Sequence, residues 1–435
     1  MDATVQEFLN FNQSAPTAWH AVEALREMLQ AQSYTLLREE EPWTLQPGGR
    51  YAVLRNGSSL IAFTLPRERP HAALIAAAHS DSPSFRIKPN AMQPGPNGAV
   101  RLSVEPYGGA VFSSWADRPL AVAGRLMLRQ GRELVLRNVC TQGPVCVIPG
   151  LAIHMNRELN SGYAWKPNID LQPLWAVGEA PDLLTLLAET AGVRREDIVS
   201  HDLQLVSLVP ACVWGPEEAF LSGPRLDDLE CAYAVVRGLT EAGESGSLAL
   251  ACVFDNEEVG SGTRQGADGS FLEDTLTRIL DALAFSREDT LRLLSGSLML
   301  SADNAHAVHP NHPEYADPAH SAQMNAGVVI KHNAAQRYVT EAVSEGLFAE
   351  ICRGAEVPVQ HYCNRADMPG GSTLGHIALR HVSVPAVDIG LAQLAMHSSW
   401  ETAGARDLPL MVRALRAFYA ADPRRTVDGG WQLWS

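Results

Sequence analysis

Several features that define other classes of protein are absent from this chain of 435 residues. No apolar stretch approaches the roughly 20 residues of a membrane-spanning helix. The first residues, MDATVQEFLNFNQ, contain neither the basic nor the apolar segment of a signal peptide. Internal repeats and low-complexity linkers are missing as well. We therefore expect a globular protein of the cytoplasm that does not associate with membranes.

Basic residues are few in relation to acidic ones. Lysine and arginine together number 34, whereas aspartate and glutamate number 49, so the formal net charge is -15. A surplus of negative charge repels phosphate groups and opposes binding to nucleic acid or to an anionic membrane. We expect neither kind of partner.

The seven cysteines are an odd number and lack the CxxC spacing of a zinc–thiolate site. Most of them lie within apolar runs, as is typical of reduced thiols in a protein core. They are Cys140, Cys146, Cys212, Cys231, Cys252, Cys352 and Cys363. We expect reduced thiols and no zinc site with thiolate ligands.

The length of the chain and its apolar fraction of 46% predict two domains with well-buried cores. Between about residues 90 and 216, short β-type runs alternate with glycine-rich turns, which indicates a small β-rich domain. On either side, strand-like and helix-like segments alternate, which predicts an α/β fold with a mixed, mostly parallel sheet flanked by helices. We assign residues 1–90 and 217–435 to one discontinuous domain and residues 91–216 to an inserted domain.

Local patterns place the elements of the α/β part. An amphipathic helix is predicted from Thr17, and Asn56-Gly57 between two apolar runs predicts a β-hairpin. Further strands are expected at residues 72–78, 248–254, 298–301, 326–330, 358–362 and 385–389. Further helices are expected from about residue 226 and at 271–284, 339–355, 373–380 and 408–420, and a helix at 180–191 interrupts the β-rich part.

The stretch VFDNEEVGSG, residues 253–262, joins an apolar run to two adjacent carboxylates and a glycine-rich turn. This pattern is expected where a buried strand delivers acids to its carboxyl end. Two desolvated carboxylates require a cation or a shared proton, so a buried Glu257-Glu258 pair favours a metal site. An exposed acidic turn is the alternative, because such pairs are common on protein surfaces.

Metal-ligand residue types recur at the ends of several predicted elements. Taken singly, each has an ordinary explanation, such as a core histidine, a charged first helix turn or a helix cap. Their joint occurrence in one α/β region favours a shared site. The five places are His79-Ser80-Asp81, Asp227-Asp228, Glu257-Glu258, Asp303 and His397.

This set of two histidines and several carboxylates suits two zinc ions per chain, with cobalt or manganese as alternatives. Two such ions activate water, so hydrolysis is the expected reaction. A carboxylate beside a ligand can accept the proton of the water, and Asp81 can orient the His79 imidazole.

Six motifs of the chain, in order, resemble the aspartyl aminopeptidase family, which consists of cytosolic di-metal exopeptidases that prefer an N-terminal Asp or Glu. They are AAHSDSPSFRIKP, SGPRLDDLECAYA, DNEEVGSGTRQGA, SADNAHAVHPNHP, IKHNAAQRYVT and LAQLAMHSSWE. The resemblance implies a di-zinc exopeptidase-like fold and peptide substrates with an acidic N-terminus. It implies metal ligands at His79, Asp227, Glu258, Asp303 and His397, with Asp227 bridging. It also implies Glu257 as general base and Asp81 as the partner of His79.

The expected substrate contacts rest on fewer signals. Lys331, which follows an apolar strand, is our candidate for the substrate carboxylate, although a lysine at a strand end can also simply extend to solvent. The resemblance of the QRY segment implies Tyr338 as a candidate donor to the oxyanion. His306 and His309 would lie one turn apart if their segment were helical, and either could line the pocket. Gly371 and Ser372 offer a backbone turn to the substrate, although the preceding Met-Pro-Gly departs from the family pattern.

The inserted region resembles the β-rich dimerisation domain of the same family, through PYGG (residues 106–109), SSWADRPLAVAGR and LAIHMNR. The resemblance implies a homo-oligomer, typically a dodecamer built from dimers. His154 either reaches the active site of a neighbouring subunit or is an ordinary loop histidine. Trp115 and Arg118 are candidate interface residues, but a domain core would use Trp115 equally well.

Two other functions remain open at this stage. A carboxypeptidase or deacylase with the same metal pair would bind a free carboxylate through an arginine, and Arg337 and Arg365 are available. A metal-free peptide-binding assembly protein would need to have lost its ligands, yet every expected ligand is present.

Overall fold

Two buried strands form the centre of the larger of two lobes in the computed structural model, which describes residues 1–434. They are β4 (Ala73–His79) and β14 (Leu248–Phe254), and every residue of both is buried. The strands pair in parallel with Phe254 opposite His79. Both therefore end at the same edge of the sheet, and the polar residues that follow them emerge side by side.

These strands belong to a nine-stranded mixed sheet with the order β1-β2-β3-β14-β4-β15-β19-β17-β18. Neighbouring strands from β14 to β19 are parallel, whereas β17 runs antiparallel to β19 and parallel to the edge strand β18. The other strands are β1 (Thr35–Leu37), β2 (Arg50–Arg55), β3 (Ser59–Thr64), β15 (Leu298–Ala302), β17 (Val328–His332), β18 (Val359–Cys363) and β19 (Ala386–Gly390).

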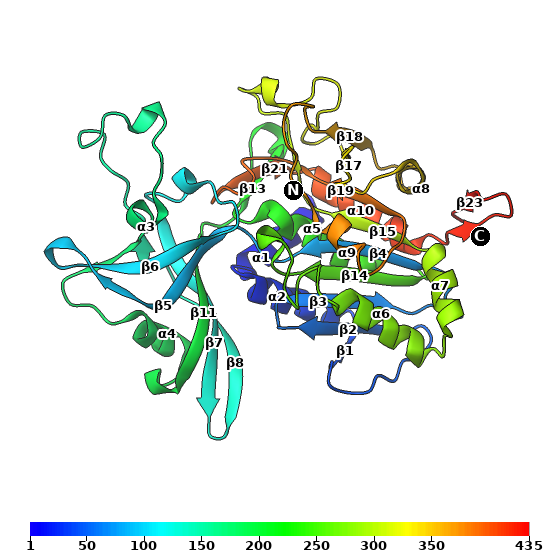
Figure 1. Ribbon diagram of the computed structural model, residues 1–435, viewed down its shortest axis with the longest axis horizontal. Coiled ribbons are helices and arrows are strands. Elements are labelled where there is room, and N and C mark those ends of the chain that lie inside the picture. The colour runs from blue at the N-terminus through cyan, green and yellow to red at the C-terminus, as the bar shows by residue number, and fades with distance from the viewer. Residues whose placement is uncertain (435) are drawn as a thin grey trace.

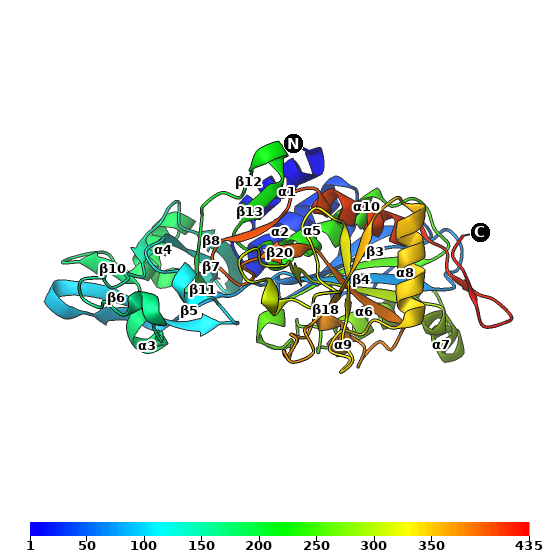
Figure 2. The same cartoon turned by 90° about the horizontal axis from the view of Figure 1, so that it is seen from above.

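Helices cover both faces of this sheet (Figure 2). One face packs against α1 (Ala3–Ser14), α2 (Ala18–Ala31), α5 (Leu226–Glu241), α8 (Ala342–Gly354) and α10 (Asp407–Ala420). The other packs against α6 (Phe271–Ala282), α7 (Arg287–Ser295) and α9 (Leu374–Ala378). The alanine-rich sequence of β4 leaves room for helices to approach the sheet closely on both sides.

The smaller lobe, at the left of Figure 1, is β-rich. Its seven strands follow the order β11-β5-β6-β10-β9-β7-β8, and β11 also pairs with β7, which closes the sheet around an apolar core. The strands are β5 (Ser84–Pro94), β6 (Ala99–Tyr107), β7 (Pro119–Gln130), β8 (Glu133–Cys140), β9 (Cys146–Val147), β10 (Leu174–Val177) and β11 (Ile198–Val206), and the helices are α3 (Pro167–Asp170) and α4 (Leu183–Ala191).

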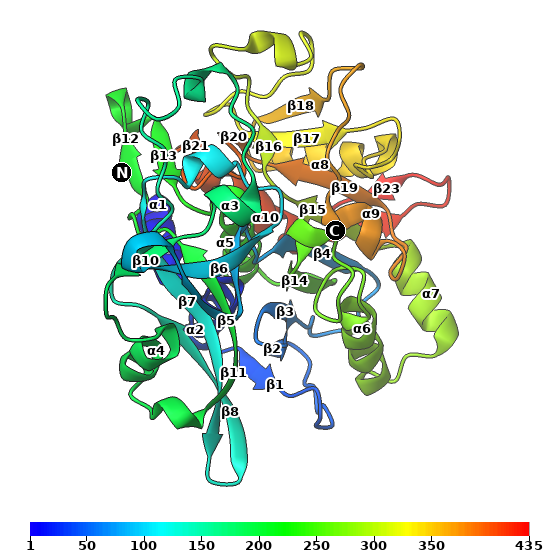
Figure 3. The same ribbon diagram turned by 60° about the vertical axis from the view of Figure 1, so that its left-hand side comes forward.

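A five-stranded sheet, β12-β13-β21-β20-β16, lies next to α5 (Figure 3). It consists of β12 (Cys212–Trp214), β13 (Phe220–Gly223), β16 (Ala305–His306), β20 (Ala392–Leu394) and β21 (Glu401–Gly404). One loop of this sheet leads from β13 into α5, which begins with Leu226 and Asp227. Another loop connects β20 to β21 and contains His397. A hairpin of β22 (Arg424–Arg425) and β23 (Trp431–Gln432) follows α10.

The predicted α/β class, with a mixed sheet covered by helices and an inserted β-rich part, is confirmed. The predicted helix after Thr17 and the hairpin around Asn56-Gly57 are present as α2 and as β2 with β3. The first helix, α1, was not predicted. The seven-stranded sheet already includes Ser84, so the chain enters it before the predicted boundary at residue 91.

Trp115 belongs to the core of the β-rich lobe. It is 4% exposed, and its ring contacts that of Phe85 at a centroid distance of 5.2 Å. The core explanation of this residue is therefore correct, and the interface explanation is wrong for Trp115. The Nε of Arg118 donates to the backbone oxygen of Ser114 at 2.7 Å.

The seven cysteines are free thiols. Four of them are buried as predicted, but Cys212 is exposed. Among residues 1–434, no helix combines the length and the apolar character needed to cross a bilayer. The cytoplasmic location stays a prediction from the sequence.

Candidate metal centre

The predicted ligands come together at the carboxyl edge of the nine-stranded sheet. His79 is the last residue of β4, Glu257 and Glu258 follow β14, and Asp303 follows β15. Asp227 lies at the start of α5. Its backbone is not helical there, so its side chain does not take the direction that a helix would give it. His397 lies in the loop between β20 and β21, with a positive φ of 67°.

Metal-ligand atoms of these residues converge in two sets that share Asp227, and a third set joins His79 to Glu257 and Glu258. Ligand atoms of His79, Asp227 and Asp303, together with Asp228, lie within 4.8 Å of one another, and so do those of Asp227, Glu258 and His397. The Nε2 of His79 is 3.7 Å from Asp227 Oδ1, and the Nε2 of His397 is 3.3 Å from Asp227 Oδ2. One carboxylate thus faces a histidine on each side, as a bridging ligand of two ions would.

The pKa values of the two glutamates show that the cluster disfavours ionised carboxylates when no cation is bound. Burial raises the pKa of Glu257 to about 8, and neighbouring acids add to the shift. Burial and the adjacent Asp227 carboxylate raise the pKa of Glu258 well above its usual value. A bound cation would keep these carboxylates ionised at neutral pH.

Several carboxylate oxygens of the cluster also lack hydrogen-bond donors, which again favours a bound cation. Asp227 Oδ1, Asp228 Oδ1 and Glu258 Oε1 are buried and accept no hydrogen bond from residues 1–434. Buried carboxylate oxygens without a donor are costly unless another partner satisfies them. Imidazole nitrogens and carboxylate oxygens are ligands that zinc accepts, so the residues present fit the metal ions that the sequence implies.

Asp81 connects the two strand ends that carry the cluster. His79 Nδ1 lies 3.0 Å from the Asp81 backbone oxygen and 3.4 Å from its Oδ1. The same carboxylate accepts the backbone N–H of Glu257 at 3.1 Å and that of Glu258 at 3.2 Å. Asp81 therefore holds both the His79 ring and the turn of the two glutamates, which supports the positioning role expected for it.

The β-rich lobe contributes Tyr107 to this network, and the sequence reasoning missed this. The Tyr107 hydroxyl donates to Asp81 Oδ2 at 2.7 Å and accepts from Asn256 Nδ2 at 2.8 Å. Gly108 follows with a φ of 71°, and a Cβ there would lie 3.2 Å from Glu258 Oε2. The PYGG motif was the available signal, although it was interpreted only as part of the inserted domain.

Glu401, at the start of β21, is a second residue that sequence reasoning did not single out. Its carboxylate accepts the backbone N–H of His397 at 2.7 Å and that of Asp227 at 3.0 Å. It is 1% exposed, and burial raises its pKa to about 8. Glu401 thus joins the start of α5, where Asp227 lies, to the loop of His397, and it is the last residue of the motif LAQLAMHSSWE.

Lys331 points inward beside Asp303. Its Nζ donates to the backbone oxygen of Asp303 at 2.8 Å and to that of Asn304 at 3.3 Å, and its side chain is 2% exposed. Burial alone would lower the pKa of this ammonium, but Asp303, Tyr338 and Asp388 raise it above its usual value. The alternative of a lysine that extends to solvent is therefore wrong, and among residues 1–434 two backbone oxygens accept from its three N–H donors.

Tyr338 lies close to Lys331 and is 4% exposed, with its ring centroid 5.1 Å from the lysine Nζ. His306 is exposed, and its ring centroid lies 6.4 Å from that of Tyr362. The segment after Asp303 is not helical: it forms the strand β16. His306 and His309 are therefore not one helical turn apart.

The remaining predicted contacts lie outside the cluster. His309 is exposed, and its Nδ1 accepts the backbone N–H of Asn311 at 3.2 Å. Gly371 and Ser372 are exposed in the loop before α9. His154 is exposed in a turn of the β-rich lobe, and within one chain it does not join the converging ligands.

This combination of fold and site is that of a zinc-dependent exopeptidase. A family model described as aminopeptidase I zinc metalloprotease (M18) matches residues 11–419. The chain belongs to this M18 family of zinc aminopeptidases.

Known proteins of the family resemble the chain over almost its whole length. The probable M18 family aminopeptidase 2 of Clostridium novyi (strain NT) is 39% identical over 423 residues, covering 95% of this chain and 98% of that protein. A chain in the cryo-EM structure of the Ape4 and Nbr1 complex has a TM-score of 0.92 at 32% identity, covering 96% of this chain and 85% of that one. A chain of the S. cerevisiae mApe1 dodecamer has a TM-score of 0.84 at 28% identity, and each chain is covered to 96%.

Proposed function

We propose that this aminopeptidase removes an N-terminal Asp or Glu from peptides with the help of two zinc ions. The observation that carries the proposal is the pair of ligand sets that share Asp227, with Glu257 beside them. His79, Asp227 and Asp303 would hold one ion, and Asp227, Glu258 and His397 the other. Cobalt or manganese would suit the same oxygen and nitrogen ligands.

Zinc ions held here would act as Lewis acids on the scissile carbonyl and would lower the pKa of a water molecule. Glu257 is the candidate base for the proton of that water. It is half-buried, and the Asp81 carboxylate accepts the backbone N–H of Glu257, which fixes the backbone there. The side chain of its neighbour Glu258 is 3% exposed, and its Oε2 lies 3.4 Å from His397 Nε2. Tyr338 is the candidate donor to the oxyanion.

Selection of a free α-amine distinguishes this proposal from a carboxypeptidase or deacylase. Peptides with a free N-terminal Asp should be cleaved, whereas the same peptides acetylated at the N-terminus should resist. The two series are compared by mass spectrometry of the released residue with the zinc-loaded protein. Equal rates on both series would contradict the proposal.

A carboxypeptidase or deacylase would need an arginine that is free to bind the substrate carboxylate. Arg365 pairs with Asp367 at 2.6 Å, and Arg337 donates to the backbone oxygen of Gly370 at 3.0 Å. Both arginines thus have partners within the chain.

Preference for an acidic N-terminal side chain of the substrate requires a cation near the metal ligands. Lys331 is a buried cation beside Asp303. Lys331→Met should lower kcat/KM for N-terminal Asp more than for N-terminal Ala, because the methionine retains the side-chain volume and lacks the charge. The readout is the ratio of the two kcat/KM values. Arg337→Met is the control, because it removes an exposed cation between Lys331 and Tyr338 in the sequence, and it should leave the ratio unchanged.

This design separates two roles of Lys331. The lysine also holds the Asp303 segment through two backbone oxygens, so its loss will lower the activity on every substrate. A uniform loss with an unchanged ratio would make Lys331 purely structural. A changed ratio only in Arg337→Met would assign the specificity to that arginine.

We also propose a homo-oligomer, by analogy with the mApe1 chain that is described as a dodecamer. The β-rich lobe protrudes from the α/β lobe, which leaves much of its surface available to another subunit (Figure 1). His154, Gly371 and Ser372 are exposed, and assembly would be needed for His154 to reach an active site. His306 and His309 stay candidates for contact with the substrate.

A further inference from the structure

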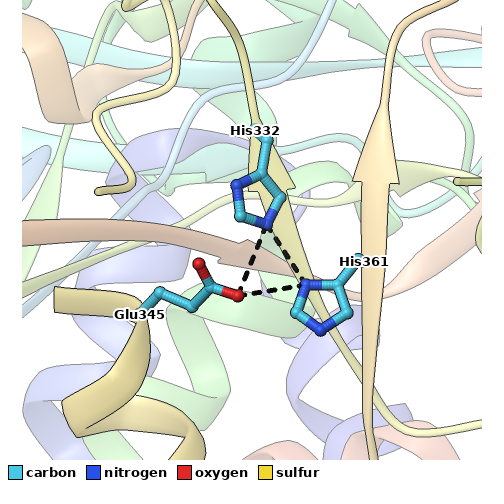
Figure 4. Close-up of side chains that lie close together, drawn as sticks. All are labelled: His332, Glu345 and His361. Atoms are coloured by element: carbon cyan, nitrogen blue, oxygen red, sulfur yellow. Dashed lines mark hydrogen bonds and ion pairs between the residues drawn. The ribbon is translucent and has the colours of Figure 1, made fainter. Parts of the chain in front are cut away.

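Two histidines and a glutamate meet at the edge of the nine-stranded sheet, apart from the catalytic cluster (Figure 4). His332 ends β17, His361 lies in the edge strand β18, and Glu345 lies in the first turn of α8. In the parallel pairing of these strands, Ile330 is opposite His361, so His332 lies two residues further on and on the same face as His361. That face is the one that α8 covers.

Three ligand atoms of these residues point at one another. His332 Nε2 is 3.2 Å from His361 Nδ1, His361 Nδ1 is 3.4 Å from Glu345 Oε1, and His332 Nε2 is 3.9 Å from the same oxygen. Only the contact between the two imidazoles is a hydrogen bond. A hydrogen bond therefore explains one of the three short distances. Neither imidazole donates a hydrogen bond to Glu345 Oε1.

The spacing is that of a metal coordination shell. Zinc–ligand bonds near 2.05 Å in a tetrahedron separate the ligand atoms by about 3.3 Å. Two of the three distances are close to this value, and the third needs a closure of roughly half an ångström. The catalytic cluster provides a comparison within the same molecule, because His397 Nε2 lies 3.3 Å from Asp227 and 3.4 Å from Glu258.

We propose that His332, His361 and Glu345 form a second metal site, separate from the catalytic centre, which takes a zinc ion or a related first-row transition metal ion. Two imidazoles and one carboxylate are a ligand set that such ions bind readily, and water would complete the shell. The side chains are 28%, 46% and 28% exposed, so an ion can enter from solvent. Burial lowers the pKa of His332, which keeps its imidazole neutral and able to coordinate.

Other histidines near acids in this chain lack the convergence. His312 Nδ1 lies 3.0 Å from Glu314 Oε1, but among the described residues no third ligand atom lies within 4.8 Å of both. His381 faces Asp268 with Nε2 and Glu273 with Nδ1, so its two acids lie on opposite sides of the ring. Within residues 1–434, the set of His332, Glu345 and His361 is the only such group of three outside the catalytic cluster.

An ion at this position would join β17, the edge strand β18 and α8. Lys331, the neighbour of His332, points to the opposite face and holds the Asp303 segment. The site would therefore fasten the strand that carries Lys331 at the edge of the sheet. It shares no residue with the catalytic cluster, so it can be tested independently of the proposed peptidase function.

The test counts zinc ions per chain. The full-length protein is stripped of metal with a chelator and equilibrated by dialysis over a range of free zinc, and bound zinc is measured by atomic spectroscopy. His361→Ala and Glu345→Gln should each bind one zinc ion fewer per chain than the wild type. His312→Ala, which removes an exposed histidine from a pair that lacks a third ligand, should bind as many as the wild type.

The difference between the proteins does not depend on how many ions the catalytic centre holds. Equal zinc binding by the wild type and His361→Ala would overturn the proposal, and so would a similar loss in His312→Ala. Unchanged circular dichroism and peptidase activity of zinc-loaded Glu345→Gln would show that its missing ion does not reflect misfolding. If Glu345→Gln loses all bound zinc together with its activity, the site is not separate and the proposal fails.

Discussion

Glu257→Gln should lower kcat by on the order of 100-fold or more, because glutamine cannot accept the proton of the attacking water. The substitution is nearly isosteric, and the Glu257 contact that the structure shows to Asp81 is made by its backbone N–H. The turn after β14 should therefore persist. We expect kcat to fall while the number of bound zinc ions stays the same.

The measurement combines steady-state kinetics on a free aminoacyl substrate with zinc analysis of the same preparation. Glu258→Gln is the matched control, because it changes the adjacent acid, whose Oε2 lies 3.4 Å from His397 Nε2. This second variant should lose zinc as well as activity. Full activity in Glu257→Gln would assign the base elsewhere, and a loss of zinc there would make Glu257 a ligand.

Asp227→Asn should have the other large effect. Asp227 belongs both to the set that contains His79 and Asp303 and to the set that contains Glu258 and His397, and its two carboxylate oxygens face His79 and His397 separately. An asparagine has one oxygen and no negative charge, so it cannot serve both sides. We expect a loss of zinc affinity beyond the roughly 100-fold that removal of an outer-shell partner can cost, with activity lost in parallel.

Zinc content after dialysis against buffered zinc, together with kcat, checks this expectation. Asp407→Asn is a suitable control, because Asp407 is also a buried acid but accepts the backbone N–H groups of Asn325 and Gly327 away from the cluster. It should reduce stability without a loss of zinc. Wild-type zinc content in Asp227→Asn would contradict a bridging role.

Much of the site could be anticipated because its residues follow apolar runs. The runs at β4 and β14 predicted buried strands, and parallel strands of one sheet present their carboxyl ends at a common edge. His79 and Glu258 could therefore be assigned to one place. The resemblance of the motifs to a known family supplied the expected roles of the individual residues, and membership of the M18 family is now shown.

Other parts of the site depend on contacts between distant segments. Tyr107 comes from a β-rich lobe that the sequence separates from the catalytic part, yet its hydroxyl joins Asp81 to Asn256. Glu401 binds two backbone N–H groups, and such a contact leaves no pattern in the spacing of residues. The segment at His306 could be interpreted as a helix from the sequence. The strand there has only two residues, which is too short to show a hydrophobic period.

The sequence by itself determined the class of the fold and the order of the main strands and helices, and it indicated candidate metal ligands that the structure brings together. It could do so because burial imposes a hydrophobic period along each element, and ligand types stand out where that period ends. Only the tertiary structure decided that Lys331 turns inward, that Tyr107 crosses between lobes, and that His332, His361 and Glu345 converge. These arrangements depend on the packing of remote elements to within an ångström, and local periodicity does not encode that distance.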